Sequence, residues 1–282
     1  MKKILFPTDF TATSENAFRY ALHIANQFNA SIATIHTFTA PVVATTPMVM
    51  VEEMAELTEQ YEMQEYQVFN KKMHQMADDL GLSRIEIKHT LEYGLAVEEI
   101  VRISKKEECD MIIMGTDGSD GFGRWLFGSH AAKVVSKATV PVLIIPNEAK
   151  YSPIKKISYA TSFEDISDNV INDLVAWISK FGAELTFVHI ASKNEYIDAE
   201  QYANMSELTD LAERYDNVKF KIIYDNDVLD ELEDYVEDES FDMLVMVTHR
   251  YPFFKRLFNP SMTRQMTFET EIPLLVYQAP KD

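Results

Sequence analysis

Three glycines and a serine near the middle of the chain have the types and the spacing to bind an anion. Gly115 and Gly118 follow an apolar run, and Gly128 and Ser129 come after nine further residues. Glycine has no Cβ, so its backbone N–H can approach an anion closely. A helix beginning at Ser129 would direct free N–H groups and the positive end of its dipole toward the same space. These residues predict a phosphate-binding loop.

The elements around this loop alternate between strand and helix. Short apolar runs predict strands at 3–6, 31–37, 84–90, 110–114 and 140–145. Helical periodicity predicts helices after Thr11 or Thr13 and over 97–104 and 129–138. Strands separated by helices indicate an α/β fold with a doubly wound, parallel, five-stranded sheet. A ligand of such a sheet lies beyond the carboxyl ends of its strands.

The whole pattern occurs twice. Residues 2–4 recur at 155–157, a shift of 153, and further along the matching shift is 132. The sequence thus predicts two tandem domains, 1–148 and 152–282, joined by a short linker. The change of shift places 21 extra residues between the second and third strands of the first copy. Because the linker is short, we expect the two domains to pack on each other.

The extra residues fall in a long amphipathic segment at 51–80. Apolar residues recur there at mostly helical spacing, at Met54, Leu57, Tyr61, Phe69, Met73, Met76 and Leu80. Glutamates are interleaved with them, which is typical of a helix with one packed face. The alternative is a lid or a surface for a partner, for which the methionines would be suited.

The chain resembles the ATP-binding branch of the universal stress protein family, which is marked by Gly, two residues, Gly, nine residues, Gly and then Ser or Thr. Gly115, Gly118, Gly128 and Ser129 match this motif without a gap. The resemblance covers essentially the whole chain and implies two tandem domains of the adenine nucleotide α-hydrolase-like fold.

The resemblance also implies further binding residues in the first copy. Pro7 and Thr8 lead to Asp9, which matches the acidic residue that contacts the nucleoside, and Thr37 lies where the second strand offers its backbone to adenine. The ligand implied is ATP, with or without Mg²⁺. The final strand at 139–145 looks like the strand that commonly pairs subunits in the family. Pairing of the two copies within the chain, or of two chains in a homodimer, would follow.

The second copy departs from this motif at nearly every ligand position. Asp9 is replaced by Ser162 and Gly115 by Val247, and the other two glycines become Arg250 and Pro260. Proline removes a backbone donor, and valine adds side-chain atoms where a phosphate would lie. We expect nucleotide to bind in the first copy alone.

Composition and charge limit the other function classes. The net charge of −19 would repel a nucleic acid backbone, so DNA or RNA binding is not expected. The absence of an apolar leader or a long apolar stretch predicts a cytoplasmic protein without a membrane span. Its one cysteine, Cys109, is expected to be buried and inert.

Two further kinds of site are not expected. The sequence contains neither a Gly-Lys-Ser/Thr phosphate loop nor a histidine motif for zinc, so neither site is expected and no residue is assigned as a direct metal ligand. His36 and His189, at matching strand ends, are expected to be structural. Asp117 and Asp120 are candidates for holding Mg²⁺ through water, although loop aspartates usually face solvent.

Three functions fit these observations. The leading hypothesis is a regulatory protein of the stress-response type that binds ATP, since a phosphate loop occurs without an identifiable catalytic residue. A slow ATPase using Asp9 or Asp117 is the second hypothesis, although the loop has no lysine and only Arg124 nearby. An interaction scaffold that binds no nucleotide is the third.

Overall fold

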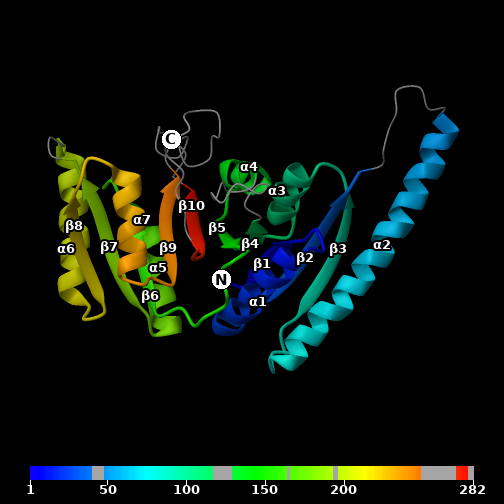
Figure 1. Ribbon diagram of the computed structural model, residues 1–282, viewed down its shortest axis with the longest axis horizontal. Helices are drawn as coiled ribbons and strands as arrows, with labels where there is room; N and C mark the ends of the chain where they lie inside the picture. Colours follow the sequence, from blue (N-terminus) through cyan, green and yellow to red (C-terminus); the bar gives the residue numbers. More distant parts are fainter. Residues whose placement is uncertain (40–47, 117–128, 164–165, 193–195, 249–270, 279–282) are drawn as a thin grey trace.

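The two copies form one continuous ten-stranded sheet with helices on both faces. The computed structural model describes residues 1–39, 48–116, 129–163, 166–192, 196–248 and 271–278 (Figure 1). The strand order is β3-β2-β1-β4-β5-β10-β9-β6-β7-β8. Each half is a parallel five-stranded sheet, and the expected α/β fold is confirmed.

The first copy contains five strands and four helices among the described residues. In chain order they are β1 (Lys3–Pro7), α1 (Ala12–Phe28), β2 (Ser31–Phe38), α2 (Met48–Asp79), β3 (Ile87–Tyr93), α3 (Ala96–Lys106), β4 (Met111–Thr116), α4 (Ser129–Lys137) and β5 (Val142–Pro146). The side chain of Thr11 caps α1 by accepting from the backbone N–H of Ser14, and Asn29 ends the helix in the left-handed conformation.

The second copy repeats the order. Its elements are β6 (Lys156–Ala160), α5 (Asp168–Phe181), β7 (Glu184–Ala191), α6 (Ala199–Arg214), β8 (Val218–Tyr224), α7 (Val228–Asp238), β9 (Met243–Thr248) and β10 (Leu274–Gln278). The main difference is one of length, because α2 has 32 residues and α6 has 16. Most of the extra residues of the first copy therefore lengthen this helix.

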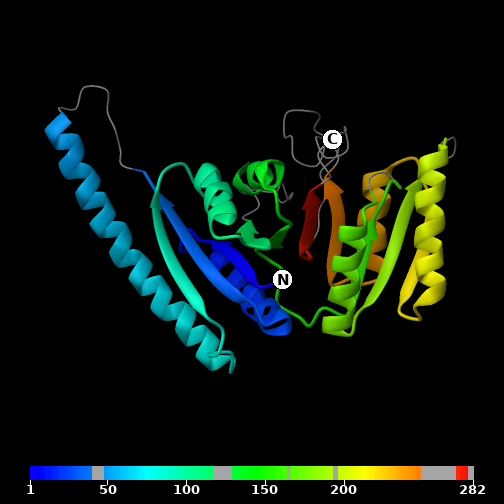
Figure 2. The ribbon, with the colours of Figure 1, turned by 180° about the vertical axis from the view of Figure 1, so that it is seen from behind.

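The core is divided by the sheet into two layers. Ile4 and Phe6 of β1 belong to the layer that includes α1, α2, α5 and α6, whereas Leu5 belongs to the layer that includes α3, α4 and α7. This alternation follows from the two-residue period of a strand. Figure 2 shows α2 along one end of the sheet and α6 along the other. In the described part of the chain no helix combines the length and the hydrophobicity needed to cross a membrane.

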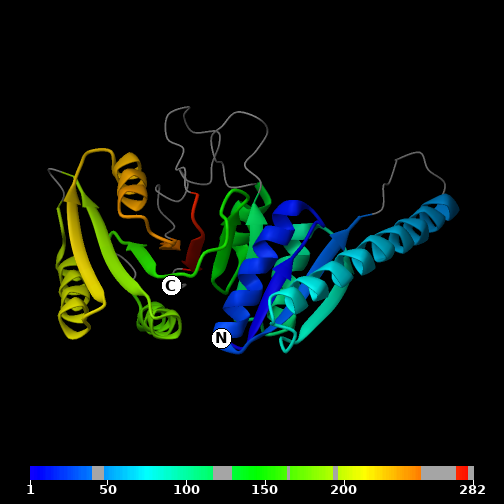
Figure 3. The same ribbon diagram turned by 60° about the horizontal axis from the view of Figure 1, so that its bottom comes forward.

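The final strands of the two copies join the halves. β5 and β10 pair antiparallel, with Leu143 opposite Leu275, so the copies pair within the chain. Beneath the sheet, the ring of Phe28 in α1 meets the ring of Trp177 in α5 edge-on, with ring centroids 5.1 Å apart. The linker is held as well, since Tyr151 stacks on His23 at 3.8 Å. Figure 3 shows the two copies side by side along the sheet.

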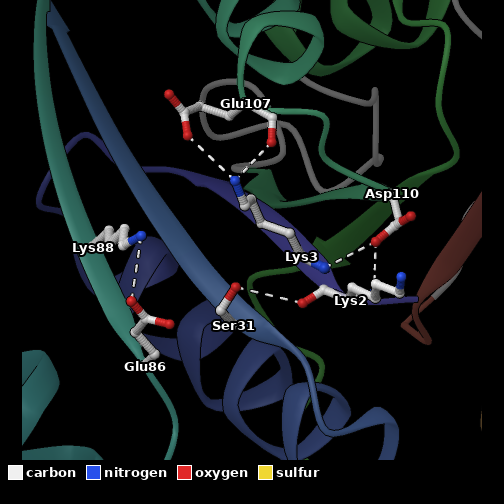
Figure 4. Close-up of polar contacts among 7 residues, drawn as sticks. All are labelled: Lys2, Lys3, Ser31, Glu86, Lys88, Glu107 and Asp110. Carbon is white, nitrogen blue, oxygen red and sulfur yellow. Dashed lines mark hydrogen bonds and ion pairs between the residues drawn. The ribbon is translucent and has the colours of Figure 1, made fainter.

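An aspartate fixes the start of the first strand in each copy. Oδ2 of Asp110 accepts from the backbone N–H groups of Lys2 at 2.5 Å and Lys3 at 2.9 Å (Figure 4). Asp242 accepts in the same way from Lys155 at 2.7 Å and Lys156 at 2.8 Å. These contacts lie at the amino ends of the strands, so the charged groups in Figure 4 belong to the end of the sheet away from the candidate site. They align β1 with β4.

The third strand begins and ends three residues later than predicted. The strand was expected at 84–90, and β3 is Ile87–Tyr93. Residues 82–85 instead form a turn in which the N–H of Ile85 donates to the carbonyl of Leu82, and both side chains are buried. Their apolar character reflects closure of the core beneath α2 and does not reflect a strand.

The apolar face predicted for the long helix is confirmed only in its second half. The second half of α2 buries Tyr66, Phe69, Met73 and Ala77. Leu57 and Tyr61, expected on the packed face, are 65% and 61% exposed. Only the later part of α2 lies against β2 and β3, so the same helical period does not produce burial along its whole length.

Cys109 is buried, as expected. Burial raises the pKa of its thiol to about 11, and the nearby Lys3 offsets only part of this effect. The thiolate is the reactive form, so the cysteine is inert at neutral pH.

Candidate nucleotide site

The strand order creates a switch point between β1 and β4. From β1 the chain passes to β2 and β3 on one side, and then returns to β4 on the other. Pro7, Thr8 and Asp9 lie at the carboxyl end of β1, and Gly115 lies at the carboxyl end of β4. Thr37 is near the end of β2, paired with Glu92 of β3. Open α/β sheets bind ligands at this place.

Asp9 is held by the first turn of α1. Its Oδ1 accepts from the hydroxyl of Ser14 at 2.6 Å, and from the hydroxyl of Thr11 at 2.7 Å and its N–H at 3.2 Å. Partial burial raises the pKa of Asp9, but these hydrogen bonds outweigh it and lower the pKa below its ordinary value. Among the described residues these contacts all fall on Oδ1, which leaves Oδ2 of an ionised carboxylate to accept from a ligand hydroxyl.

Thr8 and His36 fix the backbone beside Asp9. The N–H of Thr8 donates to the carbonyl of Ile35 at 2.9 Å, and Nδ1 of His36 donates to the carbonyl of Thr8 at 2.8 Å. Phe10 has a positive φ of 67° and stacks on the His36 ring at 4.0 Å. The chain therefore turns sharply between β1 and α1, which directs Asp9 away from the core.

The same contacts occur in the second copy. Nδ1 of His189 donates to the carbonyl of Thr161 at 2.8 Å, and Phe163 has a φ of 64° with its ring 4.2 Å from His189. Both histidines thus have the structural role that was expected from their matching positions. Since the second copy keeps this turn while losing the aspartate, the turn belongs to the fold.

Gly115 lies against the first turn of α1. A Cβ at this position would be 2.9 Å from Cγ2 of Thr13 and 3.0 Å from its carbonyl oxygen. Contacts this short do not occur for real side chains, so glycine is required by the packing of α1 on β4. The absent side chain allows the amino end of α1, and with it Asp9, to approach the end of β4.

The rest of the expected loop is described only in part. Gly118 and Gly128 lie outside the described residues, together with Asp117, Asp120 and Arg124. Ser129 is the first residue of α4, so the helix begins where the spacing predicted. The amino end of α4 follows the carboxyl end of β4 in the chain, on the side of the sheet opposite α1.

The second copy fills this corner in a different way. Its helix α5 begins at Asp168, three residues later than α1 when the copies are matched, so its first turn does not reach the position of Thr13. Val247 occupies the place of Gly115 and is buried. Gln201 and Asn204 of α6 donate to the carbonyls of Ser162 at 3.2 Å and Phe163 at 2.7 Å. The loop after β6 is therefore tied to α6.

Sequence reasoning missed the residues that connect α2 to the site. Nε2 of His36 lies 3.1 Å from Oε2 of Glu62, so α2 reaches the residue that holds Thr8. Tyr66 donates to the carbonyl of Thr34 at 2.9 Å and accepts from the N–H of Thr90 at 2.9 Å. Burial raises the pKa of Tyr66 to about 12, so its hydroxyl keeps the proton that it donates. Nothing in the periodicity of 51–80 marks either contact, because both partners are distant in the chain.

Ser14 and Thr13 were also missed as site residues. Both lie in a run of hydroxyl residues that follows Asp9, at Thr11, Thr13 and Ser14. Such a run directly after a strand-end aspartate was a usable signal, since hydroxyl groups cap helices and orient carboxylates.

Comparison with known proteins decides the family. The model of the universal stress protein family matches residues 1–146 and again 153–278. The chain belongs to the universal stress protein family. Each match covers one copy, so the protein is a tandem universal stress protein.

This chain is similar to relatives that match about half of its length and to others that match nearly all of it. Universal stress protein MJ0531 of Methanocaldococcus jannaschii is 34% identical over 151 residues, which are 53% of this chain and 84% of the relative. Universal stress protein MJ0577 of the same organism is 28% identical over 152 residues, or 51% of this chain and 94% of the relative. A universal stress protein from Archaeoglobus fulgidus shares the fold of the tandem chain, with a TM-score of 0.69 and 19% identity over 99% of this chain and 98% of that one.

Proposed function

We propose that this universal stress protein binds ATP at the β1–β4 switch point of its first copy and that nucleotide occupancy regulates its action in a stress response. The observation that supports this proposal most directly is the geometry of Asp9. Its carboxylate is ionised, it is oriented through Oδ1 by Thr11 and Ser14, and its Oδ2 can accept from a ribose hydroxyl. The glycine spacing from Gly115 to Ser129 would supply backbone N–H groups for the phosphates.

Contrast between the copies supports binding in the first alone. The first copy has an aspartate and a glycine at positions where the second has Ser162 and a buried Val247. In the second copy the strand-end loop is bonded to α6 through Gln201. A regulatory role fits the first copy because α2 contacts His36 through Glu62, so a ligand that moves the loop after β1 would act on that helix.

Calorimetry with the full chain tests the proposal. ATP titrated with Mg²⁺ should bind at a single site, and Asp9→Ala should weaken binding about tenfold or more, since a hydrogen bond to a charged group contributes about 1.5–3 kcal/mol. Gly128→Pro, which copies Pro260, should abolish binding while the circular dichroism of the fold is kept. Ser162→Ala in the second copy is the matched control and should change nothing.

The other outcomes identify the alternatives. Failure to bind ATP at millimolar concentration would favour an interaction scaffold. Turnover of bound ATP in a single-turnover assay, lost in Asp9→Ala, would favour a slow ATPase. Mass spectrometry of protein purified without added nucleotide would identify a ligand that is retained from the cell.

A further inference from the structure

Two histidines from different elements meet at the surface of the first copy, away from the candidate nucleotide site. His74 lies on α2 and His89 on β3, and their Nε2 atoms are 3.1 Å apart. The rings are nearly perpendicular, at 83°, with centroids 5.2 Å apart. His74 is exposed and His89 is half-buried, so the pair lies at the surface.

The network behind His89 sets which of its nitrogens carries the proton. Tyr66 donates its one proton to the carbonyl of Thr34, which can only accept. Oγ1 of Thr34 has one proton, and it contacts the hydroxyl of Tyr66 at 2.7 Å and the carbonyl of Lys88 at 3.3 Å. Donation to either of these acceptors uses that proton. Oγ1 of Thr34 is left to accept from Nδ1 of His89 at 2.7 Å. A neutral His89 protonated on Nδ1 presents a bare Nε2 toward His74.

This is the arrangement of a histidine that is prepared to bind a metal ion. Metal-binding histidines typically donate their second ring N–H to an oxygen, which fixes the tautomer and the ring orientation. Two imidazole nitrogens that are each about 2.0–2.1 Å from a tetrahedral metal are about 3.3 Å apart. The observed separation of 3.1 Å is close to this value. In the metal-free chain it is a hydrogen-bond distance, so the rings would have to rotate for both nitrogens to face a shared ion.

A buried oxygen on the same helix as His74 lacks a hydrogen-bond partner within the described part of the chain. Asn70 is one turn before His74 and one turn after Tyr66, so it lies between them on one row of the helix. Its Oδ1 is buried and has no hydrogen-bond partner among the described residues. No cluster of three or more His, Cys, Asp or Glu suited to a metal occurs in the part of the chain that the structure describes, so water would fill the remaining positions.

The second copy has an apolar pair in place of Thr34 and His89. Thr34 pairs with His89 between β2 and β3, and the matching pair between β7 and β8 is Phe187 with Phe220. An apolar pair therefore satisfies the fold at this position. The polar network of the first copy is an addition that the fold does not require.

We propose that His74 and His89, with the amide oxygen of Asn70, form an open binding site for a divalent transition-metal ion that imidazole prefers, such as Zn²⁺ or Cu²⁺. The bound ion would join α2 to β3. With only two imidazoles and one neutral oxygen, the site is weaker than a closed zinc site of four protein ligands. Sequence inspection does not find the site because its ligands come from both α2 and β3 and form no local motif.

Titration of the full chain with Zn²⁺, after removal of metal and nucleotide, tests the proposal. Millimolar Mg²⁺ is kept present so that the acidic surface is occupied by a hard cation. The intact chain should show a saturable site, and His74→Ala and His89→Phe should each weaken it by about tenfold or more. His89→Phe copies Phe220, and His74 is exposed, so both variants should fold. His130→Ala, which removes another exposed histidine, is the matched control.

A second variant and a second metal separate a site from general binding. Thr34→Val keeps both histidines but removes the acceptor for Nδ1, and should weaken binding about 10- to 100-fold. Electron paramagnetic resonance of the Cu²⁺-loaded chain should show coupling to both imidazoles, with one lost in His74→Ala. Equal Zn²⁺ affinity in the intact chain, His74→Ala and His89→Phe would overturn the proposal, as would equal loss in the His130→Ala control.

Discussion

At the scale of single residues, Gly115 and Asp9 are linked through the first turn of α1. The turn can lie against β4 because Gly115 has no side chain, and the same turn supplies the hydroxyl groups that hold Asp9. The glycine was interpreted from the sequence as a means of exposing backbone N–H groups to phosphate. In the structure its clearest role is in packing, and that packing places the carboxylate.

Gly115→Ala is expected to destabilise the protein by about 1–3 kcal/mol, because overpacking forces the first turn of α1 to move. The free energy of unfolding in urea measures the effect. Thr13→Ser removes the methyl group that lies 2.9 Å from the added Cβ and keeps the hydroxyl that donates to Asn147. The double variant should therefore recover part of the loss. A cost within about 0.5 kcal/mol for Gly115→Ala would show that the approach is not tight.

Asp9 should also stabilise the fold in a pH-dependent way. Its pKa in the folded chain is lower than the 3.8 of an unperturbed aspartate. The unfolded chain therefore binds the proton more strongly, so the contribution of Asp9 is complete above pH 3.8 and is lost as the pH falls through the lower folded pKa. The difference in unfolding free energy between the intact chain and Asp9→Asn should be constant near neutral pH and shrink below about pH 4. A difference that grows on acidification would contradict this interpretation.

At the scale of elements, periodic apolar patterns predicted nearly all helices and strands, and the repeat predicted their order twice. The failures have physical causes. Leu82 and Ile85 looked like part of a strand because a turn that closes the core is as apolar as a strand. The packed face of α2 was extended too far, since a helical period shows which residues share a face and not how far the neighbouring sheet reaches. The residues of the site that come from several elements, such as Glu62 and Tyr66, could not be found from spacing.

One buried hydroxyl bonds α2 to two strands of the sheet. Tyr66 bonds to both β2 and β3, so Tyr66→Phe should remove a hydrogen-bond partner from the carbonyl of Thr34 and from the N–H of Thr90, and destabilise the protein by about 1–3 kcal/mol. Tyr61→Phe removes an exposed hydroxyl from the same helix and should change stability by no more than about 0.5 kcal/mol. Hydrogen exchange should be faster in the second half of α2 for Tyr66→Phe only. Similar effects of the two changes would show that this network does not hold the helix.

At the scale of the whole molecule, the two copies share a sheet and a core. The β5–β10 pairing makes the sheet continuous, and the side chains beneath it belong to one cluster that includes residues of both copies. The linker adds to this connection, because the side chain of Asn16 in α1 donates to the carbonyl of Ala149 at 2.8 Å. The second copy can therefore support the fold of the first, in the way that a partner subunit would.

Phe28→Ala tests whether the copies unfold together. The side chain of Phe28 belongs to the first copy but packs on Trp177 and Phe181 of the second. We expect a loss of about 2 kcal/mol, less than the about 3–5 kcal/mol of a fully buried phenylalanine. If the shared core makes one cooperative unit, hydrogen exchange by global unfolding should be accelerated equally in β2 of the first copy and β7 of the second. Acceleration confined to the first copy would mean that each half unfolds separately, and that the second copy does not stabilise the first through this contact.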